Sequence, residues 1–515
     1  MRGSGGGREA SRAAGADGRF LMAAFRVLMA ASEVAPLAQT GGLGEAVGAL
    51  ARALRRQGHD VRVVLPGYAV AERAAEAAGI ALATRVERLA VPLGERVETS
   101  AVREATLPGG VPAYLLSHPR YYHRETLYTT AQGDYADNAE RFIYFSRGIL
   151  ALARATDFVP DVLHCHDWQT GLVPAYLKLV HGGEAAFGAT GTVFTVHSLA
   201  YQGLFWHYDM HLIGLSWDIF TPEGIEFYGK INLLKAGLVY ADAVAVPSPR
   251  YAQEIQTPEH GWGLEGMLRA RARDLVGILG GLDTEAWDPG KSPHLAAPYG
   301  PEDMAGKRAC KEDLLRAAGL PVAPDAPLLG WLGPLTPARG GDLFLEALED
   351  LVAMGACVVA CGADAEEATR ALALSAERHP KAVAILPGPG QDQGAAHRLI
   401  AGCDILVCPA RSEASGTYAL ASLRYGTPPL ARAAGALADA VTNYDAKTES
   451  GTGFVFREAS AGDLVRAAQR ALRAHRQQAA WAALVRRAMA QDVGWDGPAR
   501  AYAGLYARVL ERRRG

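Results

Sequence analysis

The sequence predicts an α/β protein with two doubly wound domains that face a cleft. Its 515 residues exceed the roughly 100–200 residues of one compact domain. Short, almost continuously apolar runs alternate with segments of helical periodicity, which is typical of parallel strands covered by helices on both faces. The alternation forms two series, separated by a Pro- and Gly-rich stretch around residues 287–328.

The first series predicts a domain over residues 22–290, in which residues 24–31 form a buried strand. A helix is expected next at Glu45–Arg56, because its apolar side chains recur at helical spacing. Further buried strands are expected at 61–66, 161–165, 192–196, 242–246 and 276–279.

The second series predicts a domain over residues 326–490, joined to the first by a linker at 291–325. Its strands are expected at 327–333, 356–362, 382–388 and 404–410. The tail, 491–515, is helical by pattern from residue 495. Ligands of open α/β sheets bind at the carboxyl ends of the strands, so the cleft between the domains is the expected site.

Residues 1–21 are rich in Gly, Ala, Arg and Ser, which predicts a disordered leader. The stretch lacks the apolar region of a secretory signal. Glu9 and Asp17 argue against a transit peptide, and a natural start at Met22 is the alternative that we favour.

Composition excludes several classes of function. The formal net charge is −3 with no basic tract, which argues against nucleic-acid binding. No apolar run approaches the roughly 20 residues of a membrane span. Six cysteines, several of them in apolar runs, predict buried reduced thiols. We therefore expect a cytoplasmic rather than a plastid protein, without a cofactor. His164 and His166 lack a further ligand cluster, so we expect hydrogen-bonded histidines and no metal.

A Gly-rich segment, 32–50, connects the first strand to the first helix. Gly41 and Gly42 allow the backbone to approach a ligand, and the following helix presents free N–H groups to an anion. The simpler alternative is a connecting loop without a ligand. A dinucleotide fingerprint is rejected, because residues 32–41 separate the strand from Gly42 where that fingerprint needs a tight turn.

Several further segments occur in a characteristic order. They are GDYADNAERFIYFS (133–146), HCHDWQTGLVPAYL (164–177), FTVHSLAYQGLF (194–205), EFYGKINLLKAGLVYADAVAVPSPRYAQEI (226–255) and AHRLIAGCDILVCPARSEASG (396–416). With the Gly-rich segment, they give a chain that resembles bacterial glycogen synthases and plant starch synthases over about 24–510. These are retaining glucosyltransferases that use a nucleotide-glucose donor, usually ADP-glucose, and an α-1,4-glucan acceptor. The resemblance implies two Rossmann-like domains of GT-B type, with the C-terminal helix crossing back to the first.

The resemblance also implies the site residues. The catalytic set is His197, Glu413 and Asp137. His197 is expected beside the anomeric carbon, Glu413 on the glucose ring and Asp137 nearby. The donor and phosphate site is expected to comprise Gln39, Thr40, Gly41, Gly42, Glu45, Arg339, Ser415, Gly416 and Thr417.

Several of these positions depart from the family pattern. Gln39 replaces a lysine, Pro334 an arginine and Arg339 a lysine of the diphosphate site. The remaining departures are Glu45 for Asp, Ser198 and Gly280 for Asn, and Glu413-Ala-Ser-Gly-Thr417 for the usual EPCGL.

Each lost charge-assisted hydrogen bond is worth roughly 1.5–3 kcal/mol, so a slow enzyme is expected unless a neighbour such as Arg432 compensates. Three hypotheses follow. They are an active glucan synthase, a silent paralogue (a pseudoenzyme) that binds glucan or regulates, and a transferase for another nucleotide sugar.

Overall fold

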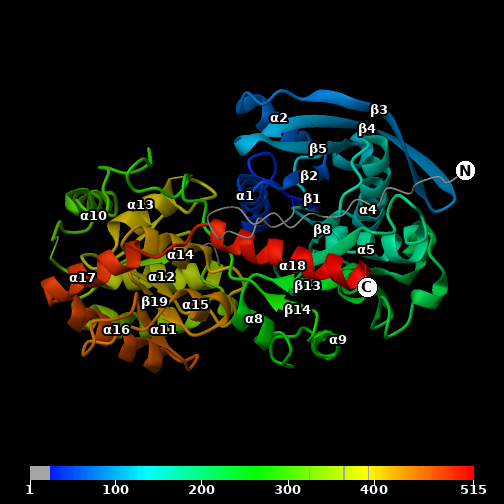
Figure 1. Cartoon of the computed structure of the whole chain (residues 1–515). Helices are drawn as coiled ribbons and strands as arrows, with labels where there is room; N and C mark the ends of the chain where they lie inside the picture. The colour runs from blue at the N-terminus through cyan, green and yellow to red at the C-terminus, as the bar shows by residue number, and fades with distance from the viewer. Residues whose placement is uncertain (1–23, 324, 363–365, 393, 515) are drawn as a thin grey trace, which may run out of the picture.

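The computed structural model describes residues 24–323, 325–362, 366–392 and 394–514, and the leader predicted at 1–21 lies outside them. Figure 1 shows two lobes, each built around its own sheet. The first domain contains a nine-stranded sheet and the second a six-stranded sheet.

Parallel strands make up most of the first sheet, in the order β14-β13-β9-β8-β1-β2-β5. Their bounds are β1 (Arg26–Ala30), β2 (Asp60–Pro66), β5 (Val111–Ser117), β8 (Val162–His166), β9 (Gly191–Thr195), β13 (Ala243–Val246) and β14 (Leu275–Gly277). The strands predicted in this domain are confirmed within one to two residues at most ends. Because β1 pairs with both β2 and β8, the strand order reverses there, and the loop after β1 opens at the switch point.

Two antiparallel strands, β3 (Ala83–Leu93) and β4 (Arg96–Leu107), extend this sheet beyond β5. The sequence analysis did not predict them. In β3 only Leu89, Val91 and Leu93 are buried, so an edge strand with one exposed face carries no continuous apolar run.

All strands of the second sheet are parallel, in the order β17-β16-β15-β18-β19-β20. Predicted strands appear as β15 (Leu328–Leu332), β16 (Cys357–Cys361), β17 (Val383–Leu386) and β18 (Ile405–Cys408), and β19 (Pro429–Arg432) and β20 (Phe454–Phe456) complete the sheet. The order reverses between β15 and β18, so the loops after these strands, which carry Arg339 and Glu413, leave the same edge.

Helices cover both sheets. In the first domain they include α1 (Gly42–Arg56), α4 (Asn138–Ala155), α7 (Leu233–Tyr240) and α8 (Pro249–Glu254), and in the second α11 (Gly341–Ala353), α13 (Ala395–Gly402), α14 (Thr417–Arg424), α15 (Gly435–Ala440) and α16 (Ala461–His475). A short sheet of β10 (Leu204–Trp206), β12 (Lys230–Asn232) and β11 (Glu226–Phe227) lies outside the main sheet of the first domain.

The segment expected as a linker, 291–325, contains helix α10 (Ala305–Ala317). Its residues Cys310, Leu314 and Leu315 are buried in one hydrophobic cluster with Leu399 and Leu406. This part of the segment is therefore packed into the second domain, since an amphipathic helix must bury its apolar face.

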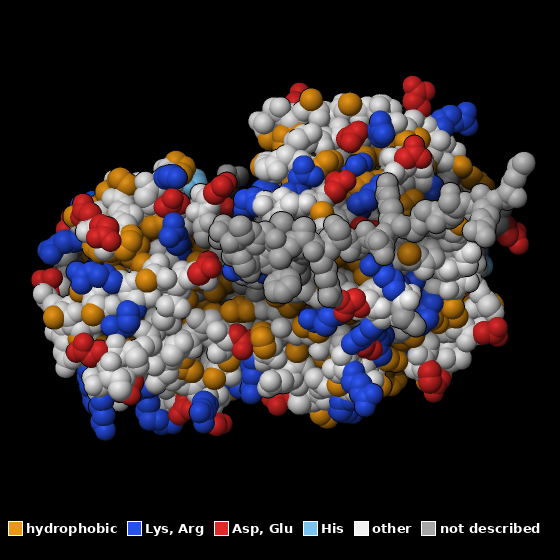
Figure 2. Space-filling model, in the orientation of Figure 1, with side chains coloured by type: hydrophobic (Ala, Val, Ile, Leu, Met, Phe, Trp, Pro, Cys, Tyr) orange, Lys and Arg blue, Asp and Glu red, His pale blue; other side chains and the backbone are white. Residues whose placement is uncertain are grey.

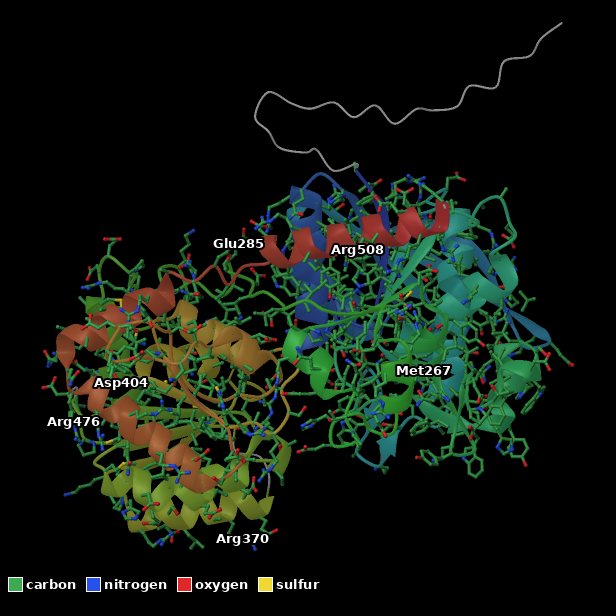
Figure 3. The ribbon with its side chains drawn as sticks, turned by 60° about the horizontal axis from the view of Figure 1, so that its bottom comes forward. Met267, Glu285, Arg370, Asp404, Arg476 and Arg508 are labelled. Carbon is green, nitrogen blue, oxygen red and sulfur yellow. The ribbon has the colours of Figure 1, made fainter. Side chains whose placement is uncertain are left out.

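Helix α18 (Asp496–Arg514) lies on the first domain, although it follows the second in sequence (Figure 1). In Figure 3, Arg508 of α18 lies on the same lobe as Met267 of the first domain, whereas Asp404 and Arg476 lie on the lobe of the second domain. Tyr502, Tyr506 and Val509 join the buried core of the first domain, and the Tyr506 hydroxyl bonds His164 Nδ1 at 2.8 Å.

No helix among the described residues is both long enough and apolar enough to cross a membrane. All six cysteines are free thiols. On the face shown in Figure 2, basic and acidic side chains are interspersed.

Candidate active site

A cavity of about 620 Å³ lies between the two domains. The first domain contributes the loop after β1 and the start of α1. The second contributes the loops after β15 and β18 and also Trp287, which is packed in a hydrophobic cluster of that domain. Most of the predicted site residues line it, namely Gln39, Thr40, Gly41, Gly42, Glu45, Arg339, Glu413, Ser415, Gly416 and Thr417. Residues far apart in sequence meet here because both switch points open on the same cleft.

The Gly-rich loop is held in place by Glu33, a buried residue. Its carboxylate accepts hydrogen bonds from the Thr40 N–H at 2.6 Å, the Thr40 hydroxyl at 2.8 Å and the Tyr128 hydroxyl at 2.7 Å. A Cβ added at Gly41 or Gly42 would meet no protein atom within 4 Å. Protein packing therefore does not require these two glycines, whereas a ligand against the backbone would.

Helix α1 begins at this loop, and its N-cap residue, Gly41, offers no side chain to the first N–H groups. Unpaired N–H groups at a helix N-terminus attract anions. The cavity wall at Gly41 and Gly42 thus suits a phosphate.

Glu45, in the first turn of α1, accepts a hydrogen bond from Trp287 Nε1 at 3.2 Å. Burial raises the pKa of Glu45, and the nearby Asp283 carboxylate adds to the effect, while the Trp287 hydrogen bond and Arg52 oppose it.

Arg339 is the only Lys or Arg among the described residues that line the cavity. In the same described part of the chain, no carboxylate lies within ion-pair distance of its guanidinium. Arg432 does not compensate, because its guanidinium donates to the carbonyls of Arg411 at 3.0 Å and Arg457 at 3.0 Å and does not line the cavity. The positive charge of the cavity wall is therefore concentrated in Arg339.

Glu413 is fixed by its own loop. Its Oε1 accepts from the N–H groups of Ser415 at 3.1 Å and Gly416 at 3.0 Å, and from the Ser415 hydroxyl at 3.2 Å. Gly416 has φ +64° at the start of α14, a conformation that glycine adopts without strain. The carboxylate is thus held at the cavity wall before any ligand arrives.

His197 follows β9 and is not among the residues that line this cavity. Its backbone N–H donates to Asp167 Oδ1 at 2.7 Å, and its Nε2 lies 3.1 Å from His166 Nδ1. Burial lowers the pKa of His197 to about 4 and raises that of Asp167 to about 7. His197 is therefore neutral near pH 7.

The pair expected from HCHDW is part of the same network. His164 is hydrogen-bonded through Nε2 to the Thr195 hydroxyl at 2.7 Å, and burial lowers its pKa to about 3. Burial also lowers the pKa of His166 well below its ordinary value, and His166 Nε2 is buried without a partner in the described structure.

Asp137 does not line the cavity either. It lies at the start of α4 and pairs with Arg124 through two contacts, at 2.8 and 2.5 Å. Partial burial raises the pKa of Asp137, but the Arg124 guanidinium outweighs this and leaves the pKa below its usual value. In this arrangement Asp137 is bound to its own domain.

Comparisons with known proteins identify the family. Residues 26–270 match the family described as starch synthase catalytic domain, and residues 318–487 match glycosyl transferases group 1. A glycogen synthase of Anaeromyxobacter sp. is 44% identical over 483 residues, which cover 94% of this chain and 99% of that protein. Glycogen synthase 2 of Geobacter sulfurreducens is 40% identical over 491 residues, covering 95% and 100%. The chain belongs to the glycogen and starch synthase family.

A solved member of this family has the same architecture. The catalytic domain of starch synthase IV from Arabidopsis thaliana, solved with ADP and acarbose, superposes with a TM-score of 0.85 at 27% identity over 95% of this chain and 100% of that one. Sucrose-phosphate synthase from Thermosynechococcus elongatus, 16% identical with a TM-score of 0.58 over 94% and 99%, shares the fold alone. The predicted GT-B arrangement of two Rossmann-like domains is confirmed.

Sequence reasoning missed several side chains of the cavity, among them Trp287, His397 and Tyr418. Trp287 stacks on His397 with ring centroids 4.2 Å apart, and burial lowers the pKa of His397 to about 4. Burial raises the pKa of Tyr418, with opposing effects of Arg339 and of the carboxylates Glu45 and Glu413. His397 lies in the 396–416 motif but was not singled out there, whereas Trp287 and Tyr418 lie outside the quoted motifs. Packing of separate segments of the chain brings the three side chains together at the cavity.

Proposed function

We propose that this glycogen synthase-type glucosyltransferase moves glucose from a nucleotide sugar, ADP-glucose being the first candidate, to the non-reducing end of an α-1,4-glucan with retention. The observation that carries the proposal is the cavity between the domains, where the Gly41–Gly42 backbone, Arg339 and Glu413 face one space. The relative from Arabidopsis thaliana, whose structure holds ADP and acarbose, supports both ligand classes.

The cavity supplies what the reaction requires on the phosphate side. Cleavage of a glucose–diphosphate bond develops negative charge on the departing phosphate and positive charge on the sugar, so fixed donors at the phosphate lower the barrier. Arg339 and the N–H groups at the start of α1 are assigned to the phosphates. Glu413 is assigned to the glucose ring.

His197 and Asp137 are assigned to the sugar side, as the resemblance implies. A neutral His197 offers a hydrogen bond without adding a second positive charge beside an oxocarbenium-like centre. The departing phosphate is the base for the incoming hydroxyl.

The glucan acceptor has support from the surface of the first domain. All strongly exposed aromatic side chains of the described residues lie between positions 201 and 262, namely Tyr201, Trp206, Tyr208, Trp217, Tyr228 and Trp262. Exposed aromatic side chains are candidates for binding, and flat aromatic faces suit the apolar faces of sugar rings.

The second candidate is a silent paralogue that binds glucan and regulates synthesis. It is favoured by the small number of positive charges at the cavity. Gln39 and Pro334 carry no charge, and Arg339 is the one Lys or Arg among the described residues that line the cavity.

Transfer of radiolabel from ADP-glucose and from UDP-glucose onto glycogen tests the first candidate. We expect slow incorporation, with calorimetry showing which nucleotide sugar binds. No incorporation from either donor by folded protein rejects it, and measurable turnover rejects the silent paralogue. Incorporation from UDP-glucose but not from ADP-glucose would identify UDP-glucose as the donor.

A further inference from the structure

Two short helices hold each other across the domain boundary by reciprocal hydrogen bonds. The Glu254 carboxylate, at the end of α8 in the first domain, accepts from the N–H of Gly435 in the second at 3.0 and 3.2 Å. In return, Asp439 of α15 accepts from the Ser248 hydroxyl at 2.5 Å and the Arg250 N–H at 2.9 Å. Each carboxylate thus meets the N-terminal end of the opposite helix, where N–H groups lack intrahelical acceptors. Figure 1 shows α8 and α15 where the lobes meet.

Gly435 lies directly against Glu413. The N–H of Ala436 donates to the Glu413 carbonyl at 2.8 Å. Gly435 has φ +45°, and a Cβ there would lie 1.8 Å from the Glu413 carbonyl oxygen. The chain at Gly435 and the chain at Glu413 therefore move together, because no space separates them.

Within the described residues, the Glu413 side chain has hydrogen bonds only to its own loop, at Ser415 and Gly416. Among the described residues, no group of the first domain donates a hydrogen bond to its carboxylate. The position of Glu413 relative to the first domain therefore depends on contacts of its neighbours. Ala414 packs against the hydrophobic core of the first domain, and Gly435, which lies against Glu413, is hydrogen-bonded to Glu254.

Helix α8 also supports the segment that carries His197. The Tyr251 hydroxyl accepts from the Leu199 N–H at 3.3 Å. Burial raises the pKa of Tyr251 to about 12, and the carboxylates of Asp167, Glu254 and Glu413 add to it. One turn of α8 thus lies beside both the histidine segment and the Glu413 loop.

Glu254 is only 9% exposed. Its remaining partner is Arg250 Nε at 2.9 Å, on the same helix. A buried carboxylate that loses its donors is costly, so this residue stabilises the arrangement in which Gly435 is docked against the first domain.

We infer that Glu254 is a positioning residue for Glu413. Docking of Gly435 on the Glu254 carboxylate fixes the Glu413 loop relative to the His197 segment, and this happens only when the two domains are closed. The inference deepens the proposed function, since it rests on the assignment of Glu413 to the glucose ring.

Kinetics of Glu254→Ala and Glu254→Gln, with Glu259→Gln as the control, test this role. Glu259 is an exposed carboxylate just beyond α8. We expect Glu254→Ala to lower kcat at least tenfold with a smaller change in KM, and Glu254→Gln, which keeps an acceptor oxygen, to retain more activity. The control should match the parent. An unchanged kcat in Glu254→Ala overturns the inference.

A double-mutant cycle with Glu413→Gln separates positioning from general destabilisation. If Glu254 acts through Glu413, adding Glu254→Ala to Glu413→Gln changes kcat less than twofold. If the kcat loss of the double variant equals the product of the losses of the two single variants, the inference is overturned. Should Glu254→Ala fold poorly, Glu254→Gln takes its place in the cycle.

Hydrogen exchange gives a readout that needs no turnover. We expect faster exchange in Glu254→Ala at the amides of Ser415, Gly416 and Ala436, and not in Glu259→Gln. Unchanged exchange at these amides overturns the inference, whatever the activity. If Glu254→Ala shows the faster exchange but the parent protein neither binds nor turns over a nucleotide sugar, the proposed function alone is overturned.

Discussion

Removing Arg339 should abolish most donor recognition while leaving the fold intact. Its loop is fixed by backbone contacts: the Arg339 N–H donates to Thr336 O at 3.1 Å. At Gly340, which has φ +74°, a Cβ would lie 2.2 Å from Pro409 O. The guanidinium has no ion-pair partner in the described part of the chain. Arg339→Gln therefore deletes a charge from the cavity wall without breaking a contact that stabilises the domain.

The magnitude follows from the role assigned to the side chain. A charge-assisted hydrogen bond of about 1.5–3 kcal/mol corresponds to roughly 10–100-fold in affinity for ADP. Loss of a transition-state donor costs about 10²–10³ in rate. We expect Arg339→Gln to lower kcat/KM by about 10²–10³, and Arg339→Lys, which keeps the charge without the fork, to lose less.

Calorimetry with ADP and steady-state transfer to glycogen measure both effects, and thermal unfolding checks the fold. Arg316→Gln is the control, because Arg316 pairs with Glu312 at 3.3 Å on α10 of the same domain and does not line the cavity. A kcat/KM of Arg339→Gln within threefold of the parent would refute the assignment of the phosphates to this wall.

Three other perturbations test separate parts of the structure. Gln39→Lys combined with Pro334→Arg restores two cations, so we expect at least a tenfold gain in turnover, and no gain means that the site has been rebuilt further. His164→Gln removes a buried histidine whose pKa is lowered to about 3. As the pH falls below 6.5, this histidine takes up a proton in the unfolded state before it does so in the folded state, which destabilises the parent. Between pH 6 and 4, urea titrations should therefore show that the free energy of unfolding falls by about 1.4 kcal/mol less per pH unit in the variant than in the parent. Equal pH dependence of the two proteins would contradict this. Trp206→Ala and Tyr228→Ala, at residues 67% and 84% exposed, should weaken retention in glycogen-containing gels without changing ADP affinity, and unchanged retention would remove the aromatic surface from the acceptor site.

Most of the parallel strands were predictable, because burial on both faces leaves a run of apolar residues in the sequence, although β5, β19 and β20 were not predicted. Val27, Leu28 and Met29 of β1 are fully buried and follow one another, as do Val358, Val359 and Ala360 of β16. Elements with one solvent-exposed face have a weaker apolar pattern in the sequence. The antiparallel pair β3 and β4, and helix α10 within the expected linker, went unrecognised for that reason.

The candidate site, too, could be predicted only in part. Motif residues on the loops after β1, β15 and β18 converge on one cavity, as strand-end loops at two switch points must. The sequence could not predict that Trp287 and His397 stack to form part of the wall. Nor could it predict that Asp137 is paired with Arg124, because such pairings depend on the packing of separate segments.

The substitutions at the donor site separate by physical role. Gln39 and Pro334 remove positive charge, whereas the groups that bind anions through the backbone remain: the unobstructed Gly41 and Gly42, and the uncapped start of α1. Backbone N–H groups keep their donors whatever side chains surround them, but neutral donors are roughly half as strong as charged ones. We therefore expect a cavity with one arginine and a helix N-terminus to bind a phosphate still, but to stabilise developing negative charge less. Slow turnover with retained nucleotide binding is the behaviour that this chemistry favours, rather than complete loss of both.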